Sequence, residues 1–177
     1  CKTKWLYIIG DDDFLLENSI NIMLHDIKSN KSTYSINYKW QPEQKWSVER
    51  PTKTAGINEF IKKIEGISQV LFISSNLYNV SLLTKYIEFG CQYQLSNAPH
   101  MITLLMGLNS NKDAKVLLSN KTIVRNGYDE VPDEKKWARS KLFRDIRFLV
   151  EIPVSKHIKV SLYNKISNSF KLENLIN

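Results

Sequence analysis

The chain has 177 residues, of which 42% are hydrophobic and 24% are charged, and these values fit one compact domain with a substantial core. The 25 Lys and Arg residues outnumber the 18 Asp and Glu residues, so the net charge of +7 permits an anionic partner without demanding one. Two cysteines exclude a disulfide framework, three scattered histidines argue against a zinc centre, and no apolar run reaches the roughly 18 residues of a membrane span.

The first predicted element is a buried strand over residues 5–10, an apolar run that three aspartates follow. Apolar residues then recur at helical spacing and predict a helix, with Asp13 placed to cap its start. The side chains expected on the core face of this helix are Leu16, Ile20, Met23, Leu24 and Ile27.

The next predicted elements lead to a third strand. Alternating residues over 33–40 predict the second strand. The polar stretch 41–56 contains two prolines and has no helical period, which predicts a long exposed loop. A short helix over residues 57–64 follows, with Gly66 placed to end it. Residues 70–73 form an apolar run that predicts the third strand.

The second half of the chain continues this alternation. Periodic apolar residues predict helices, and short apolar runs predict strands. The predicted helices cover residues 80–95, 112–118 and 134–150, and the predicted strands cover residues 101–106 and 122–124.

Five strands that alternate with five helices are typical of a parallel sheet covered by helices. We therefore predict an α/β fold with a flavodoxin-like, doubly wound, five-stranded parallel sheet and helices on both faces. The domain is expected to span residues 1–150, with residues 151–177 as a C-terminal tail or short docking element. Its candidate docking side chains are Ile158, Val160, Leu162 and Ile166.

Asp11, Asp12 and Asp13 follow the first predicted strand, at the kind of sheet edge where α/β folds bind ligands. Paired acids at this place hold Mg²⁺ in two-component receiver domains. A receiver also needs an Asp after the third strand and a Lys after the fifth, where this chain has residues 74–76 (Ser-Ser-Asn) and 125–126 (Arg-Asn). The aspartates are therefore expected to cap a helix and to face solvent, and no metal or cofactor is predicted.

Other common catalytic motifs are absent from the sequence. Neither G-x-G-x-x-G nor G-x-x-x-x-G-K-[ST] occurs, which leaves no glycine-rich phosphate loop. Ser74 and Ser75 lack the G-x-S-x-G surroundings of a nucleophilic serine. We expect these two serines to be turn residues.

Several weaker motifs occur in a recognisable order. Residues 49–56 (Glu-Arg-Pro-Thr-Lys-Thr-Ala-Gly) precede a helix and residues 70–76 (Val-Leu-Phe-Ile-Ser-Ser-Asn), residues 84–89 (Thr-Lys-Tyr-Ile-Glu-Phe) follow, and Lys136-Trp137 opens the last predicted helix. This order resembles the TIR (Toll/interleukin-1 receptor) domain, which has Arg-Asp-x-x-Pro-Gly, Ser-x-Asn, Trp-Cys-x-x-Glu and Phe-Trp at these places. The resemblance covers residues 4–150, and it departs from the family at Pro51, Ala55 and Thr84, which replace Asp, Pro and Trp.

The resemblance implies an intracellular signalling module in an innate-immune, Toll-like pathway. Such a module associates with the TIR domains of adaptors or of a second receptor chain, in a homo- or hetero-oligomer, and no nucleic-acid partner is expected. The contact is expected in the predicted loop, whose anchors are of the types that enrich interface hot spots. The loop residues are Trp46, Val48, Glu49, Arg50, Pro51, Thr52, Lys53, Thr54, Ala55 and Gly56, and the residue of the third motif is Trp137.

The same resemblance implies an enzymatic alternative. Some TIR domains cleave NAD⁺ at the nicotinamide bond with a Glu that matches Glu88. A carboxylate there could stabilise the oxocarbenium-like ribosyl cation, as glycosidase carboxylates do. NAD⁺ would then be a substrate, and the chain an NAD⁺ nucleosidase rather than a scaffold.

The resemblance also implies a place in the cell. Lys2 and Lys4 match a basic flank beside a membrane span, which favours the cytoplasmic, membrane-proximal part of a single-pass receptor. A soluble cytoplasmic adaptor is the alternative, and the sequence leaves the choice open. The basic excess lies in residues 101–177, which carry 14 basic and 8 acidic residues, outside the predicted loop.

Overall fold

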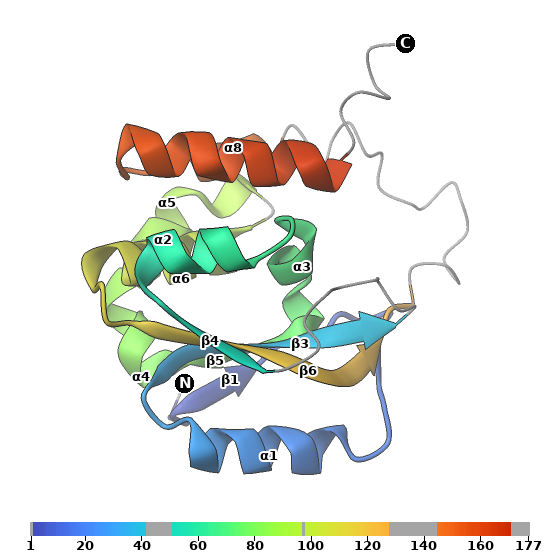
Figure 1. Ribbon diagram of the computed structural model, residues 1–177. Helices are drawn as coiled ribbons and strands as arrows, with labels where there is room; N and C mark the ends of the chain where they lie inside the picture. Colours follow the sequence, from blue (N-terminus) through green and yellow to red (C-terminus); the bar gives the residue numbers. More distant parts are fainter. Residues whose placement is uncertain (1, 42–50, 97, 128–144, 171–177) are drawn as a thin grey trace.

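The computed structural model describes residues 2–41, 51–96, 98–127 and 145–170 (Figure 1). Within these ranges six strands form one sheet: β1 (Trp5–Tyr7), β2 (Phe14–Leu15), β3 (Thr33–Gln41), β4 (Thr52–Ala55), β5 (Asn76–Asn79) and β6 (Lys115–Arg125). The α-helices are α1 (Ser19–Ser29), α2 (Gly56–Lys63), α3 (Ser68–Leu71), α4 (Val80–Leu83), α5 (Ile87–Gln92), α6 (Pro99–Ser110) and α8 (Lys156–Phe170). Short 3-10 helices are η1 (Ile73–Ser75), η2 (Thr84–Tyr86), η3 (Gln94–Ser96) and η6 (Arg147–Val150).

The sheet is mixed. Its strand order is β1-β5-β3-β6-β2, and β4 also pairs with β6. Among the described pairs, β3 and β6 run parallel and the other four are antiparallel. The predicted α/β class is confirmed, but the flavodoxin-like sheet of five parallel strands is not what forms. The first strand, expected to be buried, is a short edge strand with Leu6 partly exposed.

Two of the predicted strands are helical. Residues 101–106 lie inside α6, and residues 70–73 lie in α3 and η1. A short apolar run by itself does not distinguish a buried strand from a buried helix. Pro99 occupies the first turn of α6, a position that favours a helix start, and the apolar run continues as far as Leu108.

Residues 112–118 were predicted to form a helix, but they lead into the strand β6 and form its start. The two neighbours of β6 at this point are β3 and β4. Val116, Leu117 and Leu118 are buried in succession, as happens in a strand covered on both faces. The predicted strand over residues 122–124 is the far part of this same strand.

The sheet separates two hydrophobic clusters. One face carries Met23, Ile36 and Tyr38 and is covered by α1. The other face carries a larger cluster that includes Phe60 of α2 and Leu105 of α6. Figure 1 shows α1 on one side of the sheet and α2, α6 and α8 on the other. Helices therefore cover both faces, as expected, although the strands between them are mostly antiparallel.

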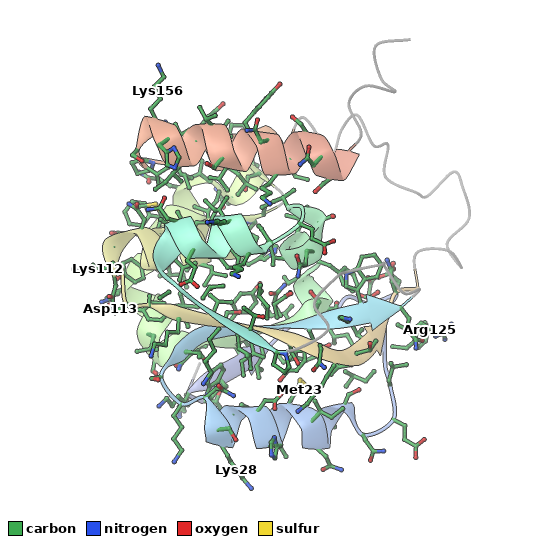
Figure 2. All side chains as sticks on the ribbon, in the orientation of Figure 1. Met23, Lys28, Lys112, Asp113, Arg125 and Lys156 are labelled. Carbon is green, nitrogen blue, oxygen red and sulfur yellow. The ribbon has the colours of Figure 1, made fainter. Side chains whose placement is uncertain are left out.

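The helix predicted after the aspartates forms, and Met23 and Ile27 of its expected core face pack in the cluster under α1, but other residues of that face do not. Ile20 and Leu24 are 59% and 50% exposed, while Ser19, Met23 and Asp26 are buried. Figure 2 shows Met23 directed from α1 toward the sheet and Lys28 directed away. Ile20 and Leu24 therefore face outward, whereas Asp26, which pairs with Lys121 of β6, faces the sheet.

The predicted loop over residues 41–56 contains a strand. Its described part, Thr52–Ala55, pairs with β6 in antiparallel register, and Thr54 is buried. The chain then turns directly into α2 at Gly56, which has φ of 65° and whose N–H donates to the Ala114 carbonyl. This left-handed conformation is one that glycine adopts at little cost.

The C-terminal helix α8 packs on α2 and joins the larger core cluster. Ile158, Leu162 and Ile166 are buried at helical spacing, whereas Val160 is 51% exposed. The Lys165 ammonium group donates to the Ile64 carbonyl at the end of α2.

The helix predicted over residues 134–150 lies mostly outside the described residues. Its described end contains η6, and Ile146 and Leu149 are buried there in the larger cluster.

Candidate functional site: an acidic loop at the sheet edge

The parallel direction of three strands defines one edge of the sheet. β1 and β3 both run antiparallel to β5, so they run parallel to each other, and β6 is parallel to β3. The chain leaves all three strands at the same edge, where the Asn126 N–H donates to the Gln41 carbonyl over 2.8 Å. The carboxyl ends of parallel strands are where α/β sheets bind ligands.

The loop Gly10–Asp13 lies at this edge and is held to the start of β5. The hydroxyl of Ser74 donates to the Asp13 carboxylate at 2.5 Å and accepts the Gly10 N–H at 2.8 Å. The N–H of Gly127, just beyond β6, donates to the other Asp13 carboxylate oxygen at 3.3 Å. Two segments far apart in sequence thus fix the orientation of one carboxylate.

A buried polar network positions Ser74. The Asn37 side-chain amide donates to the Gln69 carbonyl, the Ser75 hydroxyl and the Asn76 side-chain oxygen. The Asn76 amide donates to backbone carbonyls in turn, and all of these polar side chains are buried. Buried amides with partners are rigid, because breaking one hydrogen bond leaves an unsatisfied group. The segment expected to be an ordinary turn is therefore a fixed support for the acidic loop.

Two glycines allow the loop to pack this closely. A Cβ atom at Gly127 would lie 1.6 Å from the Asp12 carbonyl oxygen. A Cβ atom at Gly10 would lie 2.7 Å from an Asp13 carboxylate oxygen and 3.1 Å from an Asp12 carboxylate oxygen. One carboxylate oxygen of Asp12 and one of Asp13 therefore both lie close to Gly10.

Burial raises the pKa of Asp13 above its ordinary value, and the nearby charge of Asp12 adds to this rise, while the hydrogen bonds from Ser74, Gly127 and Gly10 oppose it. The Tyr7 hydroxyl donates a hydrogen bond to the Ser74 carbonyl. Burial, and to a smaller extent the charge of Asp13, raise the pKa of this hydroxyl. The site thus concentrates negative charge at a place with reduced access to water. A cation would relieve the repulsion between the two carboxylates.

The chemistry of a cation at this loop is restricted by the number of ligands. Among the described residues, no group of three or more His, Cys, Asp or Glu side chains is arranged to hold a metal ion. One or two carboxylates suffice for Mg²⁺ where substrate phosphates and waters complete the coordination. The loop fits a cation shared with a phosphate group, and it does not fit an all-protein cage.

The expected capping role of the aspartates is wrong. Helix α1 starts at Ser19, its N-cap position is Asn18, and no side chain caps it. Asp13 instead precedes β2, where the guanidinium of Arg125 lies 4.6 Å from the ring centre of Phe14. The strand β2 separates the loop from the helix that the aspartates were expected to start.

Of the residues predicted for a TIR contact, those that the structure describes are not brought to this edge. Trp46, Val48, Glu49 and Arg50, like Trp137, lie outside the described residues. Pro51 is exposed, and Thr52, Lys53, Thr54 and Ala55 form β4, whose partner residues are at the start of β6. Gly56 is buried at the start of α2. Glu88, the candidate for NAD⁺ cleavage, is exposed in the first turn of α5.

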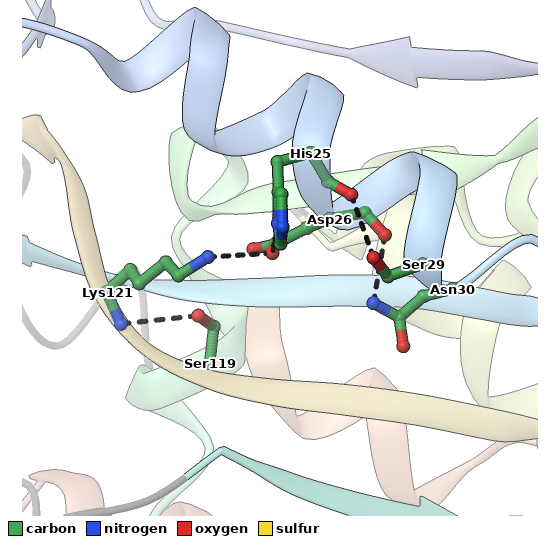
Figure 3. A network of polar contacts seen from close by, with 6 residues as sticks. All are labelled: His25, Asp26, Ser29, Asn30, Ser119 and Lys121. Atoms are coloured by element: carbon green, nitrogen blue, oxygen red, sulfur yellow. Dashed lines mark hydrogen bonds and ion pairs between the residues drawn. The ribbon is translucent and has the colours of Figure 1, made fainter.

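A second polar cluster joins α1 to β6 (Figure 3). The Asp26 carboxylate accepts from the Lys121 ammonium group at 2.7 Å and lies 3.2 Å from His25 Nδ1. The Asp26 side chain is 8% exposed and that of Lys121 36%. A buried carboxylate of this kind is stable only with its partner, so we assign this pair to helix docking rather than to chemistry.

Sequence reasoning found the three aspartates but missed Ser74 and Gly127 as their partners. These partners lie 61 and 114 residues away from Asp13 along the chain. The only local signal was polar or glycine residues directly beside predicted strands. That signal predicts turns equally well, so it does not identify the contact.

No protein-family model matches the chain, and no match was found among curated protein sequences. Among solved structures, the chain is similar to S. aureus TarS, with a TM-score of 0.54 and 12% sequence identity over 96% of this chain. The chain spans 29% of the TarS chain. At this identity the likeness shows the fold alone.

Proposed function

We propose that the acidic loop Gly10–Asp13 binds a divalent cation together with the diphosphate of a nucleotide-linked donor, in an enzyme that transfers a sugar from that donor. The observation that supports the proposal best is the pair of nearby carboxylates, Asp12 and Asp13, at the carboxyl edge of the parallel strands, where Ser74 and Gly127 hold that of Asp13 in place. The prediction of no metal gave no weight to this arrangement, because the partners are distant in sequence.

The choice of a phosphate-bearing ligand follows from the ligand count. Asp13 offers a fixed carboxylate, and Asp11 or Asp12 offers a second one. A cation with so few protein ligands takes the rest from water and from substrate, and Mg²⁺ and Mn²⁺ accept phosphate oxygens readily. The net charge of +7 also favours an anionic ligand for the chain as a whole.

We favour glycosyl transfer over phosphoryl transfer because the sequence lacks the phosphate-binding motifs that common phosphoryl-transfer enzymes use. Phosphoryl transfer in the common nucleotide-binding folds relies on a glycine-rich loop and a lysine around the phosphates, and neither glycine-rich motif is present. Transfer of a sugar needs charge stabilisation chiefly on the departing diphosphate, which a bound cation supplies. Asp11, Asp12 and Asp13 would orient that cation, and the sugar carbon would pass through an oxocarbenium-like state.

The proposal is tested by equilibrium binding. We expect uridine, guanosine or cytidine diphosphate to bind in calorimetric titrations with Mg²⁺ or Mn²⁺, and binding to disappear with chelator. Asp13→Asn should weaken binding at least about tenfold, as expected when one charged ligand of a cation is lost. The control is Asp113→Asn, an exposed carboxylate at the opposite end of β6 (Figure 2). Equal effects of the two substitutions, or binding that is indifferent to the cation, would contradict the proposal.

Association between TIR domains stays a prediction from the sequence motifs. It would place adaptors or a second receptor chain on the surface around Pro51, and it would put the chain on the cytoplasmic side of a receptor or in an adaptor. The geometry supports it less than the acidic site, because the resemblance implies five parallel strands. No helix in the described part of the chain is long and apolar enough to cross a membrane.

Cleavage of NAD⁺ by Glu88 also stays a prediction. Glu88 is exposed in α5, on a helix that contacts α6 rather than the edge that carries the acidic loop. Release of nicotinamide by the wild-type chain and its loss in Glu88→Ala would favour this alternative. The expected result under our proposal is no nicotinamide release.

A further inference from the structure

A pocket of about 370 Å³ lies beside β1, away from the acidic loop. This volume is within the usual range for small-molecule sites. Leu6 pairs with Tyr78 in the sheet, so the two side chains share the face that α4, α5 and α6 cover. The pocket is lined by Leu6, Ile8, Tyr78, Val80, Leu83, Thr84, Ile87, Gly90, Cys91, Gln94, Pro99, His100 and Thr103.

Most of the lining is apolar, and two of its polar side chains already donate their hydroxyl protons to backbone carbonyls. The hydroxyl of Thr84 donates to the Val80 carbonyl at 2.6 Å, and that of Thr103 donates to the Pro99 carbonyl at 3.0 Å. Both hydroxyl protons are thus used within their own helices. An entering molecule meets hydrocarbon surface over most of the pocket, which favours an apolar body.

His100 supplies a hydrogen-bond acceptor to this pocket. Its Nε2 lies 3.0 Å from the Leu71 carbonyl. A carbonyl oxygen only accepts, so Nε2 carries the proton and Nδ1 of the neutral ring has a lone pair. Burial lowers the pKa of His100 to about 4, which keeps the ring neutral at physiological pH. Within the described structure, no hydrogen bond uses Nδ1.

Tyr78 lies beside His100 but adds no second polar group to the pocket. Its ring meets that of His100 edge-on, with 6.2 Å between centroids. Its hydroxyl is buried and has no hydrogen-bond partner in the described part of the chain, so an entering molecule does not reach it. His100 therefore offers a hydrogen-bond acceptor in a largely apolar setting.

We propose that this pocket binds a small alcohol with a compact apolar body, whose hydroxyl donates a hydrogen bond to His100 Nδ1. The apolar body packs against the Leu6, Ile8 and Leu83 side of the pocket. Cys91 and Gln94, both exposed, lie at its solvent side. The inference does not depend on the acidic loop, since no residue of the loop lines the pocket.

The test compares cyclohexylmethanol with methylcyclohexane, which differ by one hydroxyl group. Cys91 is a free thiol that lines the pocket, so its alkylation by N-ethylmaleimide reports occupancy in the full chain with Cys1→Ser. We expect the alcohol to slow alkylation of Cys91 and to bind about 3- to 10-fold more tightly than the hydrocarbon, the value of one hydrogen bond. His100→Phe keeps an aromatic ring but removes the acceptor, together with the donor for the Leu71 carbonyl, so in a folded chain it should abolish this preference.

Each other outcome contradicts the inference. No protection by either compound in the wild-type chain, or equal protection by both, rules out a site that recognises the hydroxyl. A preference that persists in a folded His100→Phe chain rules out Nδ1 as the acceptor. Among the strands that the structure describes, none pairs with the outer edge of β1, so this edge is open to a second copy of the chain. Sedimentation of the same samples would detect such a dimer. A dimer whose Cys91 is protected without ligand would show that a second copy covers the pocket.

Discussion

The hydroxyl of Ser74 donates to the Asp13 carboxylate at 2.5 Å while it accepts the backbone N–H of Gly10 at 2.8 Å. One side chain thus closes the acidic loop at both of its ends. Ser74 is itself fully buried in η1, directly before β5 and next to the Asn37 and Asn76 network. The geometry of the proposed cation site therefore depends on a residue that is not a ligand.

Replacing Ser74 with Ala tests this dependence. The substitution leaves the Gly10 N–H without its acceptor and Asp13 without its closest donor. We expect a loss of about 1–3 kcal/mol in the free energy of unfolding, the cost of buried groups left unpaired. Urea unfolding measures it, and Ser110→Ala is the control, since Ser110 is exposed at the end of α6. Equal stabilities for the two variants would show that the contact contributes nothing.

Replacing Gly127 with Ala should displace the loop. The added Cβ would lie 1.6 Å from the Asp12 carbonyl oxygen, a distance that backbone atoms cannot accept. We expect a loss of at least about 1–3 kcal/mol in unfolding free energy, as for other overpacked sites, together with weaker nucleotide binding. Gly66→Ala is the matched control, because its Cβ would meet the movable Ser169 hydroxyl. A Gly127→Ala chain that binds normally would show that the loop tolerates displacement.

The raised pKa of Asp13 predicts how stability depends on pH. The folded state holds the Asp13 proton more tightly than the unfolded state, whose pKa is about 3.9. The resulting stabilisation is complete below that value and is lost as the pH rises through the raised pKa. A bound cation favours the ionised carboxylate and reverses this trend. Thermal unfolding with and without Mg²⁺ should therefore show larger stabilisation by Mg²⁺ at pH 7 than at pH 4.

The control for this pH dependence is Asp13→Asn, which removes the titrating group. Its unfolding temperature should respond less to pH than that of the wild-type chain between pH 4 and 7, and it should not rise with Mg²⁺. A variant that responds to Mg²⁺ as the wild-type chain does would place the cation elsewhere.

The position of α8 predicts a large effect of a single substitution near the C-terminus. Leu162 is fully buried in the larger core cluster. We expect Leu162→Ala to cost about 2–5 kcal/mol in unfolding free energy, the usual cost of a large-to-small change in a core. The neighbouring Tyr163 is exposed, so Tyr163→Ala should change the stability by less than about 0.5 kcal/mol. Similar effects at both positions would show that α8 does not pack as described.

The sequence supported the fold class and several elements, but it did not support the topology. Residues 33–40 and 57–64 have the clear alternation or helical period of one element, and both form as predicted. Residues 101–106 and 116–118 are unbroken apolar runs, which a buried helix and a buried strand share, and both assignments were reversed. Errors of that kind change strand order, because every misassigned run adds or removes a strand.

Of the candidate site, only the three aspartates could be predicted from the sequence. Asp11, Asp12 and Asp13 stand together in the sequence, directly after an apolar run, and their place at a sheet edge followed from that. The contacts with Ser74 and Gly127 depend on which strands are neighbours. The predicted sheet placed residues 74–76 after a strand at this same edge, but a serine there predicts a turn, so the sequence did not identify its contact with Asp13.

The most direct measurement of the central claim is an anomalous difference map from crystals of the chain grown with MnCl₂ and a nucleoside diphosphate. The account predicts a manganese peak within coordinating distance of the Asp13 carboxylate, with phosphate oxygens of the nucleotide on its other side. In crystals of Asp13→Asn the peak should be lost while the Ser74 segment keeps its place. A map with no peak at residues 11–13, or with nucleotide bound away from this edge, would contradict the account.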